Sequence, residues 1–116
     1  MNATRVHVVI GDDALRIALA ARVRRGADLV VAPLSTGFSG LTVGGVVLTT
    51  PADCSLLLCG ELVSRGLGVV VLTPMSREIE RAAYGLAGGR YIEMQVNTEE
   101  LFEALAEAPR GQPTLG

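Results

Sequence analysis

Residues 46–74 read VVLTTPADCSLLLCGELVSRGLGVVVLTP, and this stretch decides the fold class. It opens and closes with apolar runs, 46–50 and 69–73, which predict two strands that each end at a proline. Residues 53–65 predict a helix between them that ends at Gly66, with apolar positions at Leu57, Leu58, Leu62 and Val63. This strand–helix–strand order predicts a parallel pair, and strands that are apolar throughout are typical of a sheet with helices on both faces.

The alternation continues toward the N-terminus. Residues 5–10 (RVHVVI) predict a strand, and residues 14–25 predict a helix that Asp12 or Asp13 would cap and Gly26 would end. Residues 27–32 predict another strand. Residues 34–45 are rich in Ser, Thr and Gly, so they leave room for one or two helical turns at most.

The alternation also continues toward the C-terminus. Ser76 is expected to cap a helix with one apolar face, made of Ile79, Ala82, Ala83 and Leu86. Residues 91–94 predict a short fifth strand. Asn97 or Thr98 would cap a last helix, which would pack through Leu101, Phe102 and Leu105.

Five strand–helix repeats predict an α/β fold with a doubly wound, five-stranded parallel sheet in the order 2-1-3-4-5, flavodoxin-like and with its second helix shortened. Residues 1–108 would form this domain, and residues 109–116 (PRGQPTLG) a tail or interdomain linker. Ligands of such sheets bind at the carboxyl ends of the strands. Those ends are 11–13, 49–53 and 73–76 in this chain.

The composition excludes several functions. All ten basic residues among the 116 are arginine, and without lysine there is neither a Walker-type phosphate loop nor Schiff-base catalysis. One histidine (His7) and two cysteines (Cys54 and Cys59) leave at most three His/Cys ligands for zinc. A net charge of −2 and 3% aromatic residues argue against direct nucleic-acid binding. The sequence shows no membrane-spanning run and no signal peptide, and two free thiols indicate the cytoplasm.

Residues 4–108 resemble the receiver domain of bacterial two-component response regulators, most of all the N-terminal receiver of LuxR-type regulators. RVHVVIGDDALRIALAARV resembles the family's first strand, acidic pair and first helix. LGVVVLTPMS resembles its fourth strand, with the switch hydroxyl on Thr73. AGGRYIEM and NTEELFEAL resemble its fifth strand and last helix, with the aromatic switch position on Tyr91.

The same resemblance shows what is missing. It implies that Asp12 and Asp13 occupy the family's Mg²⁺-binding acidic pair, as weak candidates for metal ligands. The phosphoacceptor position falls on Thr50 and the lysine position on Met94. Asp53, three residues after Thr50, is a possible displaced acid, although we expect it to cap the helix over 53–65. No cation replaces the lysine, so we expect an atypical, or pseudo-, receiver without phosphorylation and without a cofactor.

The expected function is therefore regulatory and not enzymatic. The chain would be a phosphorylation-independent regulatory and dimerisation module, and we expect a homodimer. The interface would be formed by the helix after Ser76, residues 91–94 and the last helix, or by the first and last helices. It would bind DNA only through a missing C-terminal domain. An alternative is a sensor that binds a small molecule in the cleft framed by Asp12, Thr50 and Thr73; a flavodoxin-like nucleotide binder ranks below both.

Each singled-out residue also has a plainer interpretation. Asp12 would be a helix cap, and the Thr73 hydroxyl would bond to local backbone. Tyr91 and His7 would be packing residues, and Cys54 and Cys59 small core residues.

Overall fold

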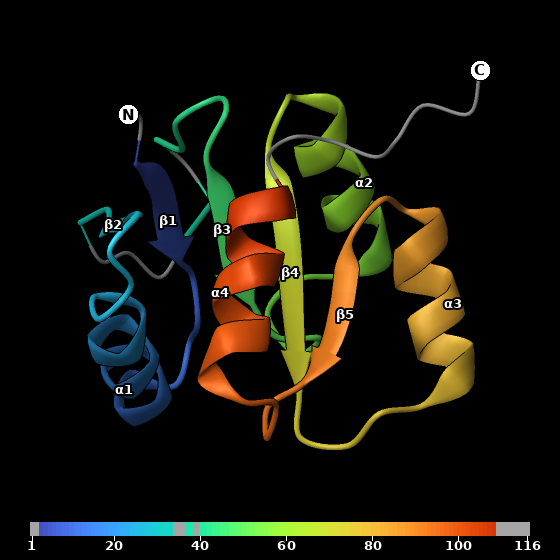
Figure 1. Cartoon of the computed structure of the whole chain (residues 1–116). Helices are drawn as coiled ribbons and strands as arrows, with labels where there is room; N and C mark the ends of the chain where they lie inside the picture. The colour runs from blue at the N-terminus through green and yellow to red at the C-terminus, as the bar shows by residue number, and fades with distance from the viewer. Residues whose placement is uncertain (1–2, 34–36, 39, 109–116) are drawn as a thin grey trace.

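The computed structural model describes residues 3–33, 37–38 and 40–108. Its centre is a parallel sheet in the order β2-β1-β3-β4-β5 (Figure 1), which confirms the predicted topology. The strands are β1 (Thr4–Val8), β2 (Leu29–Val31), β3 (Val46–Thr49), β4 (Gly68–Thr73) and β5 (Arg90–Glu93). Thr49 pairs with Val71 and Thr73 with Glu93, so the carboxyl ends of the central strands meet at one edge of the sheet.

Within the part of the chain that the structure describes, four helices cover the two faces of the sheet. Helices α1 (Asp13–Val23) and α4 (Thr98–Glu107) pack on one face, and α2 (Leu56–Ser64) and α3 (Glu78–Leu86) pack on the other. Alternate strand residues serve the two faces, as the period of two requires. Leu48, Val70 and Leu72 pack toward α1 and α4, whereas Val47 and Val71 pack toward α2 and α3.

The helix caps correct two expectations. Asp12 caps α1 through Leu15 and Asn97 caps α4 through Glu100, as predicted. Asp53 does not cap a helix: α2 begins at Leu56, and Ser55 accepts the hydrogen bond from the amide of Leu58. Asp53 is unavailable because other donors hold its carboxylate.

Ser76 does not cap α3 either. The helix begins two residues later, at Glu78, and its N-cap Arg77 makes no side-chain capping bond. The Ser76 hydroxyl instead accepts a hydrogen bond from Nη2 of Arg81 at 2.7 Å.

The connection between β2 and β3 runs from residue 32 to residue 45. In its described residues, 32–33, 37–38 and 40–45, it forms no helix; residues 34–36 and 39 lie outside the described residues. The amide of Thr42 donates to Nε2 of His7 at 3.1 Å, which fastens the connection to β1. Gly44 has φ +89°, a conformation that favours glycine. The expected tail, 109–116, also lies outside the described residues.

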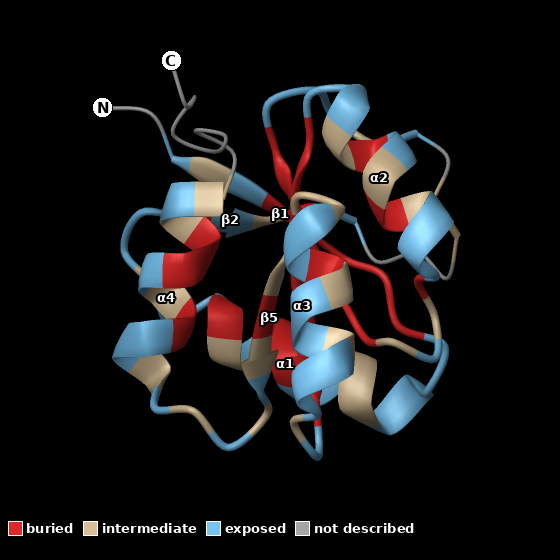
Figure 2. Cartoon of the chain, turned by 90° about the vertical axis from the view of Figure 1, so that its right-hand side faces the viewer, coloured by how far each residue is buried: buried red, intermediate tan, exposed pale blue. Residues whose placement is uncertain are grey.

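Helix α3 carries its apolar stripe on the outside. Ile79, Ala82 and Leu86 share a face as predicted, but Ile79 is 88% exposed and Leu86 is 92% exposed. Tyr84 is the residue that anchors α3 to the sheet. Figure 2 shows α3 mostly in the colour of exposed residues, unlike the buried strands behind it.

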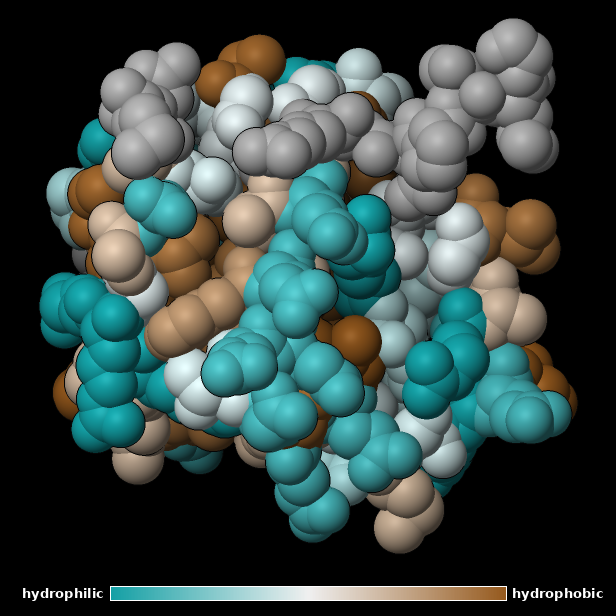
Figure 3. Space-filling view, in the orientation of Figure 1, coloured by the Kyte–Doolittle hydropathy of each residue, from teal (hydrophilic) through white to brown (hydrophobic). Residues whose placement is uncertain are grey.

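Hydrophilic side chains cover α4 on the face that it shares with α1. Figure 3 shows hydrophilic side chains running over α4 down the middle of this face, with apolar atoms at the right-hand margin, on the side of α3. No helix in the described part of the chain is long and apolar enough to cross a membrane.

Candidate functional site

The carboxyl ends of β3 and β4 and the residue after β5 border one cleft of about 530 Å³. Thr50 follows β3, Thr73 ends β4 and Met94 follows β5, and all three line the cleft. Asp12, Asp13 and Asp53 are not among its lining residues. The structure thus brings together three of the residues singled out from the sequence and leaves the acidic ones outside.

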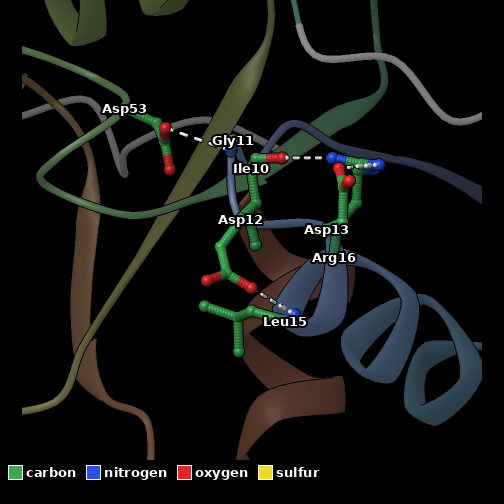
Figure 4. Close-up of polar contacts among 7 residues, drawn as sticks. All are labelled: Ile10, Gly11, Asp12, Asp13, Leu15, Arg16 and Asp53. Atoms are coloured by element: carbon green, nitrogen blue, oxygen red, sulfur yellow. Dashed lines mark hydrogen bonds and ion pairs between the residues drawn. The ribbon is translucent and has the colours of Figure 1, made fainter.

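The acidic pair after β1 is already occupied by protein donors. Oδ1 of Asp12 accepts a hydrogen bond from the amide of Leu15 at 2.8 Å, as the cap of α1. Oδ1 of Asp13 pairs with Nη2 of Arg16 at 2.6 Å, and Nη1 of Arg16 donates to the carbonyl of Ile10. Figure 4 shows the two carboxylates pointing in different directions.

Asp53 joins two loops at this edge of the sheet. Its Oδ1 accepts from the amide of Gly11 at 3.1 Å, and its Oδ2 accepts from Oγ1 of Thr50 at 2.7 Å. The residue therefore bridges the loop before α1 and the loop before α2, near the acidic pair in space (Figure 4). The sequence singled out Asp53 as a possible displaced acid but did not predict its bond to Thr50. The spacing i, i+3 across Pro51 was the available signal for that bond.

These oxygens do not make a magnesium site. Mg²⁺ requires oxygen ligands in near-octahedral geometry around one point. The three carboxylates are engaged separately, and within the described residues no group of three or more His, Cys, Asp or Glu side chains is arranged to hold a metal ion. The residues present therefore do not fit the metal that the resemblance implies.

Thr73 and Met94 occupy neighbouring positions on the cleft. The amide of Met94 donates to the carbonyl of Thr73 at 2.8 Å, which continues the β4–β5 pairing by one residue. The Thr73 hydroxyl donates to the carbonyl of Met75 at 2.9 Å, so it bonds to local backbone. Met94 packs against the core cluster beneath α1 and α4. Arg90 does not substitute for a lysine here, because it opens β5 and pairs with Glu107 at 3.4 Å.

Tyr91 is held inward by several contacts. It is 5% exposed, its ring stacks on that of Tyr84 with centroids 5.7 Å apart, and the guanidinium carbon of Arg81 lies 5.6 Å from its centroid. Its hydroxyl donates to the carboxylate of Glu80 and accepts from the amide of Arg77. Sequence reasoning missed Glu80, which had no signal beyond its position on α3.

The remaining reactive side chains are buried away from the cleft. Cys54 and Cys59 are buried free thiols, and burial raises the pKa of Cys54 to about 12, so that this thiol stays protonated. Burial, with the nearby positive charge of Arg5, lowers the pKa of His7. His7 is neutral at physiological pH and accepts a hydrogen bond, as a packing residue does.

Comparison with known proteins supports the fold directly. No protein-family model and no curated protein matches the chain in sequence. Three solved structures resemble it across most of its length. The response regulator ChrA of a heme-sensing two-component system matches with a TM-score of 0.76 and 23% identity, over 100% of this chain and 61% of ChrA. FixJ-N matches with a TM-score of 0.75 and 20% identity, over 99% of this chain and 100% of FixJ-N. A response regulator from Thermotoga maritima matches with a TM-score of 0.71 and 18% identity, over 94% of this chain and 99% of that regulator.

Because the sequence identities are below 25%, these structural matches show the fold of the chain. This chain spans 61% of the length of ChrA but the whole of FixJ-N. TM-scores of 0.71 to 0.76 over at least 94% of this chain show that its backbone follows the same path as these three structures. The chain therefore has the fold of the receiver domains of response regulators.

Proposed function

We propose that this chain is a phosphorylation-independent regulatory module, a pseudo-receiver from the N-terminal part of a LuxR-type bacterial transcription regulator. The observation that carries the proposal is the state of the acceptor position. Thr50 occupies the acceptor position, and its hydroxyl donates a hydrogen bond to Oδ2 of Asp53 at 2.7 Å. No aspartate is among the described residues that line the cleft, and the chain contains no lysine.

Electrostatics supports the same proposal. A phosphoryl group carries about two negative charges at neutral pH and is stabilised by positioned cations. Among the residues that line the cleft, Arg77 is cationic, and the anionic Glu80 lies on the same side. The lining thus offers no net positive charge to a phosphoryl group.

We further propose that the output is association with a second copy through α3. Ile79, Ala82 and Leu86 form a stripe at i, i+3 and i+7 that the fold leaves uncovered. Exposed apolar stripes of this kind are typical of helix-mediated interfaces. The module would act by binding and not by catalysis, in the cytoplasm, and would reach DNA only through a further domain, since its own net charge is −2.

Sedimentation equilibrium tests this proposal. The protein should be dimeric, and acetyl phosphate with Mg²⁺ should leave the dimerisation constant unchanged. The double variant Ile79→Glu, Leu86→Glu should weaken the dimer at least tenfold, because each carboxylate would have to be buried. The matched control is Ile17→Glu, since Ile17 is 58% exposed on α1. A monomer under all conditions, or a dimer that forms only with acetyl phosphate, would reject the proposal.

A second candidate function is small-molecule sensing at the cleft, and the cleft itself favours it. Its volume of about 530 Å³ falls within the size range of ligand sites, and it lies where open α/β sheets bind ligands. A ligand there would bias the loops before α2 and α3. A screen by thermal shift in which no compound changes the melting temperature would count against this candidate.

A further inference from the structure

The lining of the cleft limits what it can bind. This inference rests on the second candidate function, the sensing of a small molecule, and deepens it. Six of the ten lining residues are apolar or small: Leu15, Pro51, Ala52, Pro74, Met75 and Met94. Burial of apolar ligand surface against them would supply most of the binding free energy.

The two hydroxyls on the lining have committed their protons. Oγ1 of Thr50 lies 2.7 Å from Oδ2 of Asp53, and an ionised carboxylate can only accept, so the proton of Thr50 points there. Oγ1 of Thr73 lies 2.9 Å from the carbonyl of Met75, which can also only accept. Each hydroxyl therefore offers the cleft a lone pair and no proton.

The hydroxyl oxygen of Thr73 can still accept one more hydrogen bond. Its oxygen accepts from the amide of Met75 at 3.3 Å, which uses one of the two acceptor sites of a hydroxyl. One site remains for a donor on a ligand. The Thr50 hydroxyl donates one hydrogen bond and, within the described residues, accepts none.

The charges on the lining cancel. Arg77 and Glu80 are opposite in sign, and Glu80 already accepts the hydroxyl of Tyr91. The lining therefore carries no net charge, and neither an anion nor a cation gains a net electrostatic attraction from it.

We propose that the cleft binds an uncharged, mainly apolar small molecule that donates an N–H or O–H hydrogen bond to the hydroxyl oxygens of Thr50 and Thr73. In this proposal the hydroxyls at the position of the family's phosphate site accept hydrogen bonds from a ligand instead of donating them to a phosphoryl group. A hydroxyl that holds a phosphoryl oxygen must donate to it, whereas the protons of Thr50 and Thr73 are already donated to Asp53 and to the carbonyl of Met75.

Two matched probes test this polarity. Indole is an apolar bicycle with one N–H donor, and benzofuran has nearly the same shape with an ether oxygen in its place. Each is titrated into the protein to concentrations on the order of 1 mM, where fragments of this size bind, and followed by ¹H–¹³C methyl spectra of Met75, Met94 and Leu15. Indole should bind about fivefold more tightly than benzofuran, as one net hydrogen bond predicts, and inorganic phosphate should not shift these methyl groups.

Two variants localise the effect. The double variant Thr50→Val, Thr73→Val keeps the shapes of the side chains and removes both acceptors, so it should lower the affinity for indole to that for benzofuran. Met94→Lys places a cation in the cleft and should weaken indole at least tenfold. Leu57→Lys is the matched control, because Leu57 is 79% exposed on α2 and does not line the cleft.

Several results would overturn the proposal. Equal affinities for indole and benzofuran would remove the donor requirement, and shifts caused by phosphate would show an anion site. Methyl shifts that follow protein concentration without any probe would show that a second copy fills the cleft. Absence of binding by both bicycles would reject the site together with the sensing candidate, but it would leave the phosphorylation-independent module standing, because that rests on separate measurements.

Discussion

The Asp53 carboxylate should stabilise the fold by linking two loops, and its removal should lower the free energy of unfolding. The variant Asp53→Ala leaves two donors without their partner, the amide of Gly11 and the hydroxyl of Thr50. Gly11 is exposed, so water replaces the carboxylate there at little cost. Thr50 is 7% exposed, so its hydroxyl loses a charge-assisted bond that water replaces poorly. Bonds to charged groups contribute about 1.5–3 kcal/mol, and Asp53 is itself half-buried, so we expect a loss of about 2 kcal/mol.

Urea unfolding measures this loss, and a double-mutant cycle assigns it to the pair. Thr50→Val removes the hydroxyl and keeps the branched shape, and the double variant completes the cycle. The pair should show a coupling free energy of about 1–2 kcal/mol, the size typical of residues in direct contact. Asp53→Asn keeps an oxygen acceptor without the charge and should lose about half as much as Asp53→Ala.

The reasoning fails if the two single variants add without coupling, or if Asp53→Ala is as stable as the parent protein. Either result would mean that the carboxylate is free in solution. A free carboxylate next to the acidic pair would be available to accept a phosphoryl group, which contradicts the proposed function.

Three further effects should be measurable by unfolding. Burial lowers the pKa of His7 below its ordinary value of 6.5, so the unfolded chain takes up the proton first as pH falls; stability should be constant above pH 6.5 and decrease below it until the folded pKa is reached. His7→Gln does not titrate and should remove this part of the slope, and an unchanged slope would exclude His7 as its source. Leu72→Ala opens a cavity at a residue that is 0% exposed and should cost about 2–5 kcal/mol, whereas a loss below about 1 kcal/mol would argue against the packing described. Asn97→Ala should cost about 1 kcal/mol through the lost cap of α4, with Asn97→Asp retaining stability, and equal losses for both would refute the capping role.

The sheet was predictable from the sequence because its signals are local and repeated. The first four apolar runs end at Gly or Pro, and four of the five following segments have helical spacing. The order 2-1-3-4-5 then follows from the right-handed crossover and from covering both faces. Asp12 and Asn97 were correctly expected as caps because the cap directly precedes a periodic segment.

The errors lie where a side chain has a non-local partner. Asp53 looks like a cap in the sequence, but it bonds to Gly11, 42 residues away, so Ser55 takes the capping role. The stripe of Ile79, Ala82 and Leu86 has the spacing of a packing face, but burial of Tyr84 against Tyr91 turns that stripe outward. Periodicity identifies a face without saying whether the fold or a partner covers it.

The convergence of three singled-out residues on one cleft was predictable from the sequence, but not all of their hydrogen bonds were. Thr50, Thr73 and Met94 meet at one cleft because the carboxyl ends of parallel strands share an edge. The Thr73 hydroxyl bonds to local backbone, as its plainer interpretation expected, whereas the bond from the Thr50 hydroxyl to Asp53 was missed.

Intact-mass spectrometry after incubation with acetyl phosphate and Mg²⁺ tests the central claim most directly. A receiver domain with an acidic acceptor and a lysine serves as the positive control in the same mixture. The account predicts that the control gains one phosphoryl group while this chain keeps its unmodified mass. An acid-labile phosphoryl group on this chain that disappears in Asp53→Asn would contradict it.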